Sequence, residues 1–201
     1  MPVVVHVVDD DDQFRVAIGR LLRTSGYEVA EYQSASQLLS SLPDSTSASC
    51  ILLHVKMPDI SGPELQDQLA QRGSELPIVF LTGQGDIPTT VQAMKSGAQD
   101  FLTKPVTTDI LLAAIERAIT WHKSQLEEIN RQQMERALVD KLTPREREVF
   151  ELVSGGKINK QIAHELGTTV RTIKAHRRRV MEKLNTGSFA ELISMKGRLG
   201  T

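Results

Sequence analysis

The chain of 201 residues has one cysteine, one tryptophan and only 4% aromatic residues. The single cysteine, Cys50, excludes a disulfide framework within one molecule and is typical of a reducing compartment. The apolar start, residues 3–8, is too short to span a membrane. It runs into four aspartates, where a signal peptide would need its cleavage site. We therefore expect a cytoplasmic protein without membrane association.

The chain has almost no excess of either charge, but the two signs are unevenly distributed. The net charge is -1, yet residues 142–201 hold twelve Lys and Arg against six Asp and Glu. That part is therefore +6, and residues 1–141 are -7. The length allows two modest domains, each with its own core. The basic part favours a polyanionic partner, and the acidic part favours a metal or another cationic ligand.

The first 119 residues alternate between short apolar runs and stretches long enough for helices, such as residues 63–72 and 87–96. Five runs read as strands, at residues 3–8, 27–32, 50–53, 77–82 and 99–102. Continuous apolar strands that alternate with helices predict an α/β fold, with a five-stranded, doubly wound parallel sheet covered on both faces. Ligands of such sheets bind at the carboxyl ends of the strands.

Polar residues follow these predicted strands. Asp9 and Asp10 end the first, His54 follows the third, Thr82 ends the fourth, and Lys104 follows the fifth. Adjacent acids repel each other, so a bound cation explains their position better than a solvated loop or a helix cap does. We expect all five side chains to meet at one edge of the sheet.

These positions resemble the receiver domains of bacterial response regulators of the FixJ type. The motifs are Val-Val-Asp9-Asp10 with Arg15, His54-Val-Lys-Met-Pro-Asp-Ile-Ser-Gly62, Leu-Thr82-Gly-Gln-Gly-Asp86, Ala-Met-Lys-Ser-Gly-Ala98 and Asp-Phe101-Leu-Thr-Lys104-Pro105. The resemblance implies that Asp9 and Asp10 bind Mg²⁺ and that Lys104, before a cis Pro105, pairs with phosphoryl oxygens. It also gives Thr82 and Phe101 the role of switch residues.

His54 is the departure from this pattern, because the resemblance implies a phosphoryl-accepting aspartate at its position. We expect His54 to block ordinary phosphorylation and to weaken Mg²⁺ binding by removing one ligand. A protonated His54 could stand in part for the cation beside Asp9 and Asp10, which would make the domain pH-sensitive. The substitution fits two origins: a receiver that switches without phosphate, or an engineered change that fixes the regulator in one state.

Three other acids lie near these strand ends, and each could be proposed as a substitute phosphoryl acceptor, but simpler interpretations are available. Asp11 and Asp12 are expected to cap or charge the N-terminus of the first helix, and Asp59 to lie in a turn.

The C-terminal part predicts a small all-α domain. Thr143-Pro-Arg-Glu146 is a capping box that begins a helix, which ends at residues 154–156. A short helix over residues 159–166 stops at Gly167, and Thr169 caps a third helix that runs to about Leu184. Two short helices joined by a glycine-containing turn predict a helix-turn-helix.

This part resembles the LuxR-type output domains of NarL and FixJ regulators. The motifs are Leu-Thr-Pro-Arg-Glu-Arg-Glu148, Asn-Lys160-Gln-Ile-Ala163, Thr169-Val-Arg-Thr-Ile-Lys174-Ala-His176 and Lys183-Leu184. The resemblance implies a helix, capped by Thr169, whose residues at base edges are Val170, Arg171, Lys174, Ala175 and Arg178. Residues nearer phosphates would be Lys160, His176, Arg177 and Arg179.

Three details of this domain carry separate expectations. The helical wheel places Val170, Ile173, Val180 and Leu184 on an inward side. Ile158 departs from the family pattern, and Asn159 is expected to take over its capping role. His176 is equally well interpreted as a structural histidine.

Residues 107–134 predict one long helix, because they contain no glycine or proline. Its apolar positions recur at spacings of three and four: Ile115, Ile119, His122, Leu126 and Ile129. They fit either a dimerising seam or a last receiver helix that packs on its own sheet and continues as a solvated connector.

The interpretation is a receiver domain over residues 1–119, a helical linker over 120–137 and a helix-turn-helix domain over 138–201. The chain is expected to be a transcription regulator of a two-component system, without enzymatic turnover or an organic cofactor. Expected partners are double-stranded promoter DNA, a sensor histidine kinase, RNA polymerase and a second copy of the chain. Two alternatives are a metal-dependent phosphohydrolase that uses Asp9 and Asp11, and an architectural DNA-binding protein without regulation.

Overall fold

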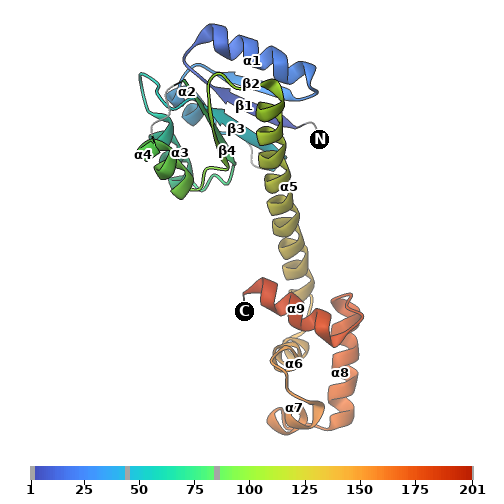
Figure 1. The fold of residues 1–201 in the computed structure, drawn as a ribbon. Helices are drawn as coiled ribbons and strands as arrows, with labels where there is room; N and C mark the ends of the chain where they lie inside the picture. The colour runs from blue at the N-terminus through green and yellow to red at the C-terminus, as the bar shows by residue number, and fades with distance from the viewer. Residues whose placement is uncertain (1–2, 44–45, 84–86, 201) are drawn as a thin grey trace. The chain divides into compact units, whose positions relative to one another are not determined.

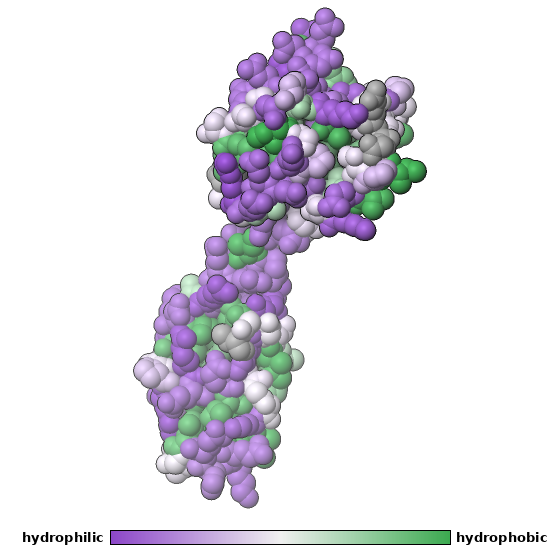
Figure 2. Space-filling view, turned by 90° about the vertical axis from the view of Figure 1, so that its left-hand side faces the viewer, coloured by the Kyte–Doolittle hydropathy of each residue, from purple (hydrophilic) through white to green (hydrophobic). Residues whose placement is uncertain are grey.

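The computed structural model describes residues 3–43, 46–83 and 87–200. It contains two compact units, residues 1–127 and 128–201, and the long helix α5 (Thr108–Val139) runs from the first unit into the second (Figure 1). On the face seen in Figure 2, hydrophilic side chains predominate over both units, and hydrophobic side chains lie in separate small patches. None of the helices in the described ranges is both long enough and apolar enough to cross a membrane.

The first unit is a five-stranded parallel sheet in the order β2-β1-β3-β4-β5. Its strands are β1 (Val4–Val8), β2 (Glu28–Tyr32), β3 (Ser49–Leu53), β4 (Ile78–Thr82) and β5 (Asp100–Thr103). The covering helices are α1 (Asp12–Thr24), α2 (Ala35–Ser40), α3 (Gly62–Gln71), α4 (Ile87–Lys95) and the first part of α5. Two apolar cores lie on the two faces, so the predicted doubly wound fold is confirmed.

Burial within the sheet explains its sequence pattern. Every residue of β3 and β4 is buried, because these central strands have helices on both faces. The edge strand β2 is only partly buried and carries polar residues. The register places Val8 beside Tyr32 and Leu53, so β1, β2 and β3 end level with one another.

Helix α5 is longer than the predicted range, since it continues to Val139. Its residues Ile115, Ile119 and His122 are buried, and the two isoleucines belong to the core on the sheet. The Nδ1 atom of His122 lies 3.1 Å from both the amide nitrogen and the carbonyl oxygen of Ser49. The structure therefore favours a receiver helix that packs on its own sheet over a dimerising seam along these three positions.

The second unit is a bundle of short helices that follows the end of α5. These are α6 (Pro144–Ser154), α7 (Asn159–Glu165), α8 (Val170–Lys183) and α9 (Phe189–Leu199). Its core contains Val149 and Phe150 of α6, Ile162 of α7 and Ile173 and Val180 of α8. Helix α9 was not predicted, although Ser188 caps it by accepting a hydrogen bond from the backbone N–H of Glu191.

Candidate functional site: a receiver edge with histidine, and a basic helix

Asp9 lies at the carboxyl end of β1 and is 4% exposed. Its Oδ1 accepts a hydrogen bond from the backbone N–H of Asp11 (3.0 Å), and its carbonyl oxygen accepts one from Arg15 Nη1 (2.7 Å). Asp10 is exposed. The buried carboxylate of the pair is thus held in a fixed position, while its neighbour faces solvent.

Lys104 provides the cation beside Asp9. Its Nζ lies 3.0 Å from Asp9 Oδ2 and 3.2 Å from the centroid of the Phe14 ring. The backbone N–H of Lys104 donates to Thr82 O (2.7 Å), which ties the loop after β5 to the end of β4. The Lys104–Pro105 bond is cis, as the resemblance implies.

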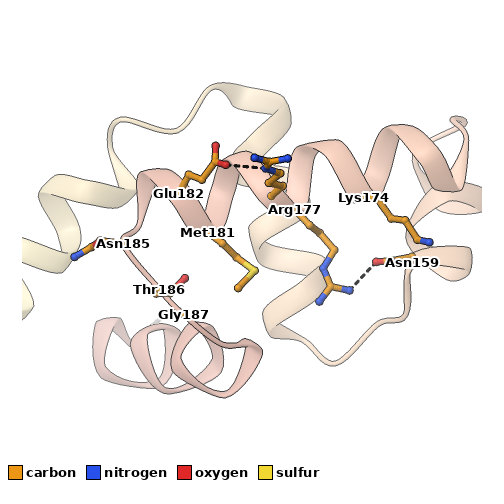
Figure 3. Close-up of a pocket in the computed structure, with 9 residues that line it drawn as sticks. Asn159, Lys174, Arg177, Met181, Glu182, Asn185, Thr186 and Gly187 are labelled. Carbon is orange, nitrogen blue, oxygen red and sulfur yellow. Dashed lines mark hydrogen bonds and ion pairs between the residues drawn. The ribbon is translucent and has the colours of Figure 1, made fainter.

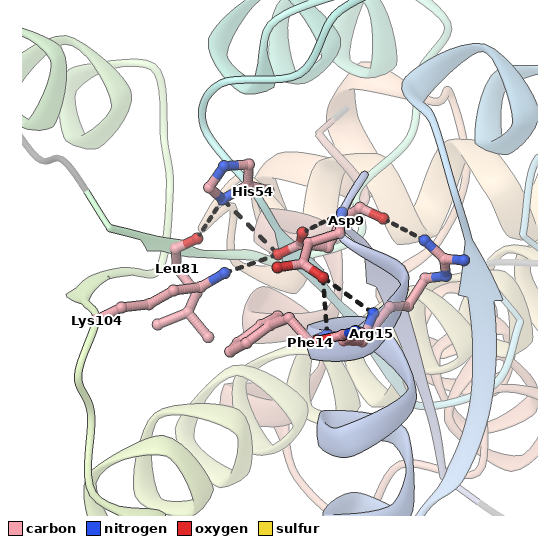
Figure 4. A network of polar contacts seen from close by, with 8 residues as sticks. Asp9, Phe14, Arg15, His54, Leu81 and Lys104 are labelled. Carbon is pink, nitrogen blue, oxygen red and sulfur yellow. Dashed lines mark hydrogen bonds and ion pairs between the residues drawn. The ribbon is translucent and has the colours of Figure 1, made fainter.

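His54 follows β3 and faces the same place (Figure 4). Its backbone N–H donates to Val8 O (2.9 Å), and its Nδ1 lies 3.0 Å from Leu81 O and 3.7 Å from Asp9 Oδ2. A carbonyl oxygen only accepts, so Nδ1 carries the hydrogen and is directed to Leu81. Lys104 is nearer to Asp9 than His54 is, and the role of His54 as a partial cation stays a prediction.

Helix α3 starts close to the loop that carries His54. A Cβ atom on Gly62 would lie 2.5 Å from His54 O and 2.8 Å from the Phe80 ring. Only glycine allows this approach, so Gly62 fixes the path of the chain after His54.

The two predicted switch residues lie nearby on β4 and β5. Thr82 is 1% exposed, and Phe101 is half-buried with its ring centroid 5.7 Å from that of Phe80. The structure brings Asp9, His54 and Lys104 together at one edge of the sheet, whereas Asp10 is exposed.

The donor set at this edge does not match an ordinary Mg²⁺ site. Mg²⁺ prefers oxygen ligands in octahedral geometry, and His54 offers nitrogen. Both carboxylate oxygens of Asp9 already have partners, Asp11 N–H and Lys104 Nζ. Within the described ranges, no group of three or more His, Cys, Asp and Glu side chains is arranged to hold a metal ion.

The remaining acids have the structural roles that the sequence predicts. Asp11 caps α1, because its Oδ1 accepts hydrogen bonds from the N–H groups of Gln13 (2.9 Å) and Phe14 (3.1 Å). Asp12 lies in the first turn of that helix. Asp59 Oδ2 accepts from the Ser36 N–H (2.9 Å). The carboxylate of Asp11 is directed at its helix, which disfavours a hydrolase that pairs it with Asp9.

The third helix of the C-terminal unit, α8, exposes the predicted DNA-contact residues. These are Thr169, at its N-cap, and Val170, Arg171, Lys174, Ala175, Arg178 and Arg179, with Lys160 exposed on α7. His176 and Arg177 are half-buried. The inward side contains Ile173, Val180 and Leu184.

Two expectations for this domain are wrong. Val170 is not on the inward side: it is 39% exposed, because it is the first residue of α8 and lies beyond the core. Asn159 does not cap α7, since Ile158 occupies the N-cap position without a side-chain hydrogen bond. Instead, Asn159 Oδ1 accepts a hydrogen bond from Arg177 Nη1 (2.6 Å).

Arginines 177 and 178 are adjacent in sequence but differently restrained. Arg177 is bound to Asn159 and lies over the Phe189 ring at 5.5 Å, so it joins α7, α8 and α9. Arg178 pairs with Glu182 at 2.8 Å, and its side chain is 83% exposed. Both line a groove of about 510 Å³ along α8, together with Lys174 and the segment 185–187 (Figure 3).

His176 has an unexplained feature. Its Nδ1 is buried without a hydrogen-bond partner among the described residues, which does not decide between a structural role and a phosphate contact.

Both units match known protein families. Residues 5–116 match the family described as response regulator receiver domain, and residues 140–196 match the bacterial regulatory proteins of the luxR family. Nodulation protein W of Bradyrhizobium diazoefficiens is 42% identical over 198 residues, 98% of this chain and 86% of that protein. Transcriptional regulatory protein FixJ of Azorhizobium caulinodans is 39% identical over 196 residues, 95% of this chain and 90% of that protein.

Solved structures agree with these matches. The response regulator StyR has a TM-score of 0.85 and 40% identity, covering 98% of this chain and all of that one. Full-length FixJ from B. japonicum has a TM-score of 0.60 and 38% identity, and the match covers 98% of this chain and 97% of that one. The fold and its strand-end site thus define a receiver domain joined to a helix-turn-helix domain. The chain belongs to the two-component response regulators with a LuxR-type DNA-binding domain.

Proposed function

We propose that this chain regulates transcription by binding promoter DNA through α8, and that its receiver domain does not take the ordinary aspartyl phosphate. The observation that carries the first part is the exposed basic side of α8 in a helix-turn-helix unit of the LuxR family. The observation that carries the second part is His54, which lies beside Asp9 and Lys104 at the edge of the sheet.

The proposed DNA contacts follow from how such a helix enters the major groove. Its N-terminal residues reach base edges, and an arginine there can bind guanine through two hydrogen bonds. Val170, Arg171, Lys174, Ala175 and Arg178 take this role in our proposal. Lys160, His176, Arg177 and Arg179 contact phosphates. Arg178 must leave Glu182 to reach DNA, while Arg177 stays bound to Asn159.

The receiver domain keeps the residues that surround a phosphoryl site but lacks the nucleophile itself. Phosphoryl transfer depends on positioned charge around one acceptor, and Lys104 and Thr82 remain in place for that purpose. Mg²⁺ binding through Asp9 and Asp10 is weakened in our proposal, because the third carboxylate is absent. The protein itself performs no enzymatic turnover.

The proposed partners are promoter DNA, a sensor histidine kinase that contacts the receiver, and RNA polymerase downstream. The chain acts as a homodimer in its DNA-bound form. FixJ is by its name a transcriptional regulatory protein, and StyR is by its name a response regulator, which supports this class of function.

The DNA proposal is tested by alanine substitutions in the full chain. The target duplex is first selected from random sequences, and binding to it is compared with binding to an unrelated duplex. Arg178→Ala and Lys174→Ala should each reduce discrimination between the two by about 1–3 kcal/mol, because each loses a base contact. Lys160→Ala should weaken binding to both duplexes equally. It should also lower by about 1 the slope with which the logarithm of the binding constant depends on the logarithm of the salt concentration.

Lys123→Ala is the matched control, because Lys123 is an exposed lysine in the first unit. It should leave both affinities unchanged. Equal loss of discrimination in Lys160→Ala and Arg178→Ala would contradict the assignment of base and phosphate contacts.

A further inference from the structure

Arg177 is a cation of α8 that is held by side chains from two other helices. Its Nη1 donates a hydrogen bond of 2.6 Å to Oδ1 of Asn159, the first residue of α7. Its guanidinium lies 5.5 Å from the centroid of the ring of Phe189, the first residue of α9. The Arg177 side chain is half-buried. These contacts restrain the guanidinium before any DNA is bound.

The groups that hold Arg177 carry no charge. An amide oxygen and an aromatic ring attract a guanidinium but leave its positive charge in place. Arg178 differs, because the carboxylate of Glu182 pairs with it at 2.8 Å and balances its charge. The hydrogen bond to Asn159 uses one N–H group of Arg177, so other N–H groups remain for a further acceptor. Arg177 is therefore restrained and still cationic.

The position of Arg177 indicates which acceptor this is. Arg177 lines the groove of about 510 Å³ along α8, together with Lys174, and Figure 3 shows its side chain extending to Asn159. On the DNA-binding side of a helix-turn-helix, the anions to be met are phosphates, whose oxygens match the N–H groups of an arginine. An unrestrained arginine loses side-chain freedom when it makes such a contact, and this loss lowers affinity.

We propose that Asn159 is a positioning residue for DNA binding, which holds Arg177 in place for a DNA phosphate without neutralising it. Phe189 supports the same side chain from α9. The inference rests on the proposed function, in which Arg177 contacts a phosphate. Because phosphates carry no sequence information, Asn159 raises the affinity for any duplex and leaves discrimination unchanged.

The first test measures binding of the full chain to the target duplex and to an unrelated duplex over a range of salt concentrations. Arg177→Ala should weaken both by about tenfold and lower the salt slope by about 1, because one phosphate contact is lost. Asn159→Ala should weaken both by about threefold, since Arg177 must then be ordered on binding. Added to Arg177→Ala, it should have no further effect.

Asn159→Asp distinguishes positioning for DNA from a purely structural role. A carboxylate still accepts the hydrogen bond of Arg177, so the free energy of unfolding should not fall, yet it neutralises the arginine. DNA affinity should therefore fall by about tenfold, as in Arg177→Ala. Asn185→Asp is the matched control, because Asn185 is exposed and lines the same groove. It adds the same charge and should weaken binding by at most about threefold.

The outcomes separate this inference from the proposed function. A loss of affinity in Arg177→Ala without one in Asn159→Ala would overturn the inference and leave the phosphate contact in place. Unchanged affinity in Arg177→Ala would remove both, whereas Arg178→Ala and Lys174→Ala would still test DNA binding by α8. Equal losses in the two aspartate variants would also overturn the inference, because the added charge alone would then be responsible.

Helix circular dichroism identifies any variant that fails to fold. If Asn159→Ala unfolds, Asn159→Asp decides, because it keeps the hydrogen bond to Arg177. Full DNA affinity in a folded Asn159→Asp chain would contradict the proposal.

Discussion

At the scale of single residues, the surroundings of His54 come from several strand ends. The sequence predicts that Asp9, His54 and Lys104 meet, because parallel strands end at one edge of the sheet. It does not predict the Phe14 ring beneath Lys104 or the contact of His54 Nδ1 with Leu81 O. These depend on side-chain directions and on a backbone carbonyl, which residue types along a chain do not specify.

The buried His6 gives the strongest prediction about how stability depends on pH. It is 6% exposed on β1, and its Nδ1 lies 3.2 Å from the Tyr32 hydroxyl. Burial lowers its pKa from 6.5 to about 4. The unfolded chain therefore takes up this proton near pH 6.5, and the folded chain only near pH 4. The free energy of unfolding therefore has its full value above pH 6.5, and it falls by about 3 kcal/mol as the pH falls towards 4.

Urea denaturation across this pH range measures the effect. His6→Gln should flatten the fall in unfolding free energy below pH 6.5 relative to the unchanged chain. His164→Gln, at an exposed histidine of α7, is the control and should keep the fall. An equally steep fall in His6→Gln would contradict the role of His6.

At the scale of elements, the apolar runs and two of the cap signals predicted strands and helices well, and two other local signals were missed or misread. Both ends of each of the five strands lie within one residue of the prediction, because each apolar run is bounded by turn residues. The capping box at Thr143 and the cap at Thr169 are confirmed. Helix α9 was not predicted, although Ser188 and Glu191 mark its start. Asn159 was taken for a helix cap. Its side chain instead binds Arg177, which lies on another helix, and such a contact is not visible in the local sequence.

The start of α7 provides a prediction about stability. Ile158 is its N-cap, in extended geometry (φ -81°, ψ 156°), and it is 61% exposed. Ile158→Thr should raise the free energy of unfolding of the second unit by about 1 kcal/mol, because the hydroxyl can accept a hydrogen bond from a free N–H of the first turn. Urea denaturation followed by helix circular dichroism measures it.

Ile193 is the matched control for this change. It is an exposed isoleucine (42%) inside α9, where a hydroxyl has no free N–H to accept from. Ile193→Thr should give no gain. A gain of equal size at both positions would show that loss of exposed apolar surface, rather than capping, is responsible.

At the scale of the whole molecule, the charge division predicted two domains with different partners, and the structure has two compact units. The predicted boundaries at residues 119 and 137 stay predictions. Residues between them already belong to the two units: His122 contacts Ser49 in the first, and Glu135 accepts hydrogen bonds from Arg198 in the second. Burial raises the pKa of Glu135, but its bonds to Arg198 and Arg131 lower it overall.

The central claim is that His54 disables ordinary phosphorylation in an otherwise normal receiver domain. Its most direct test is the intact mass of the protein after incubation with acetyl phosphate and Mg²⁺, for this chain and for His54→Asp. The account predicts that only His54→Asp gains one phosphoryl group, and that its oligomeric state and DNA affinity then change. A stable acyl phosphate on the chain with His54 would contradict the account.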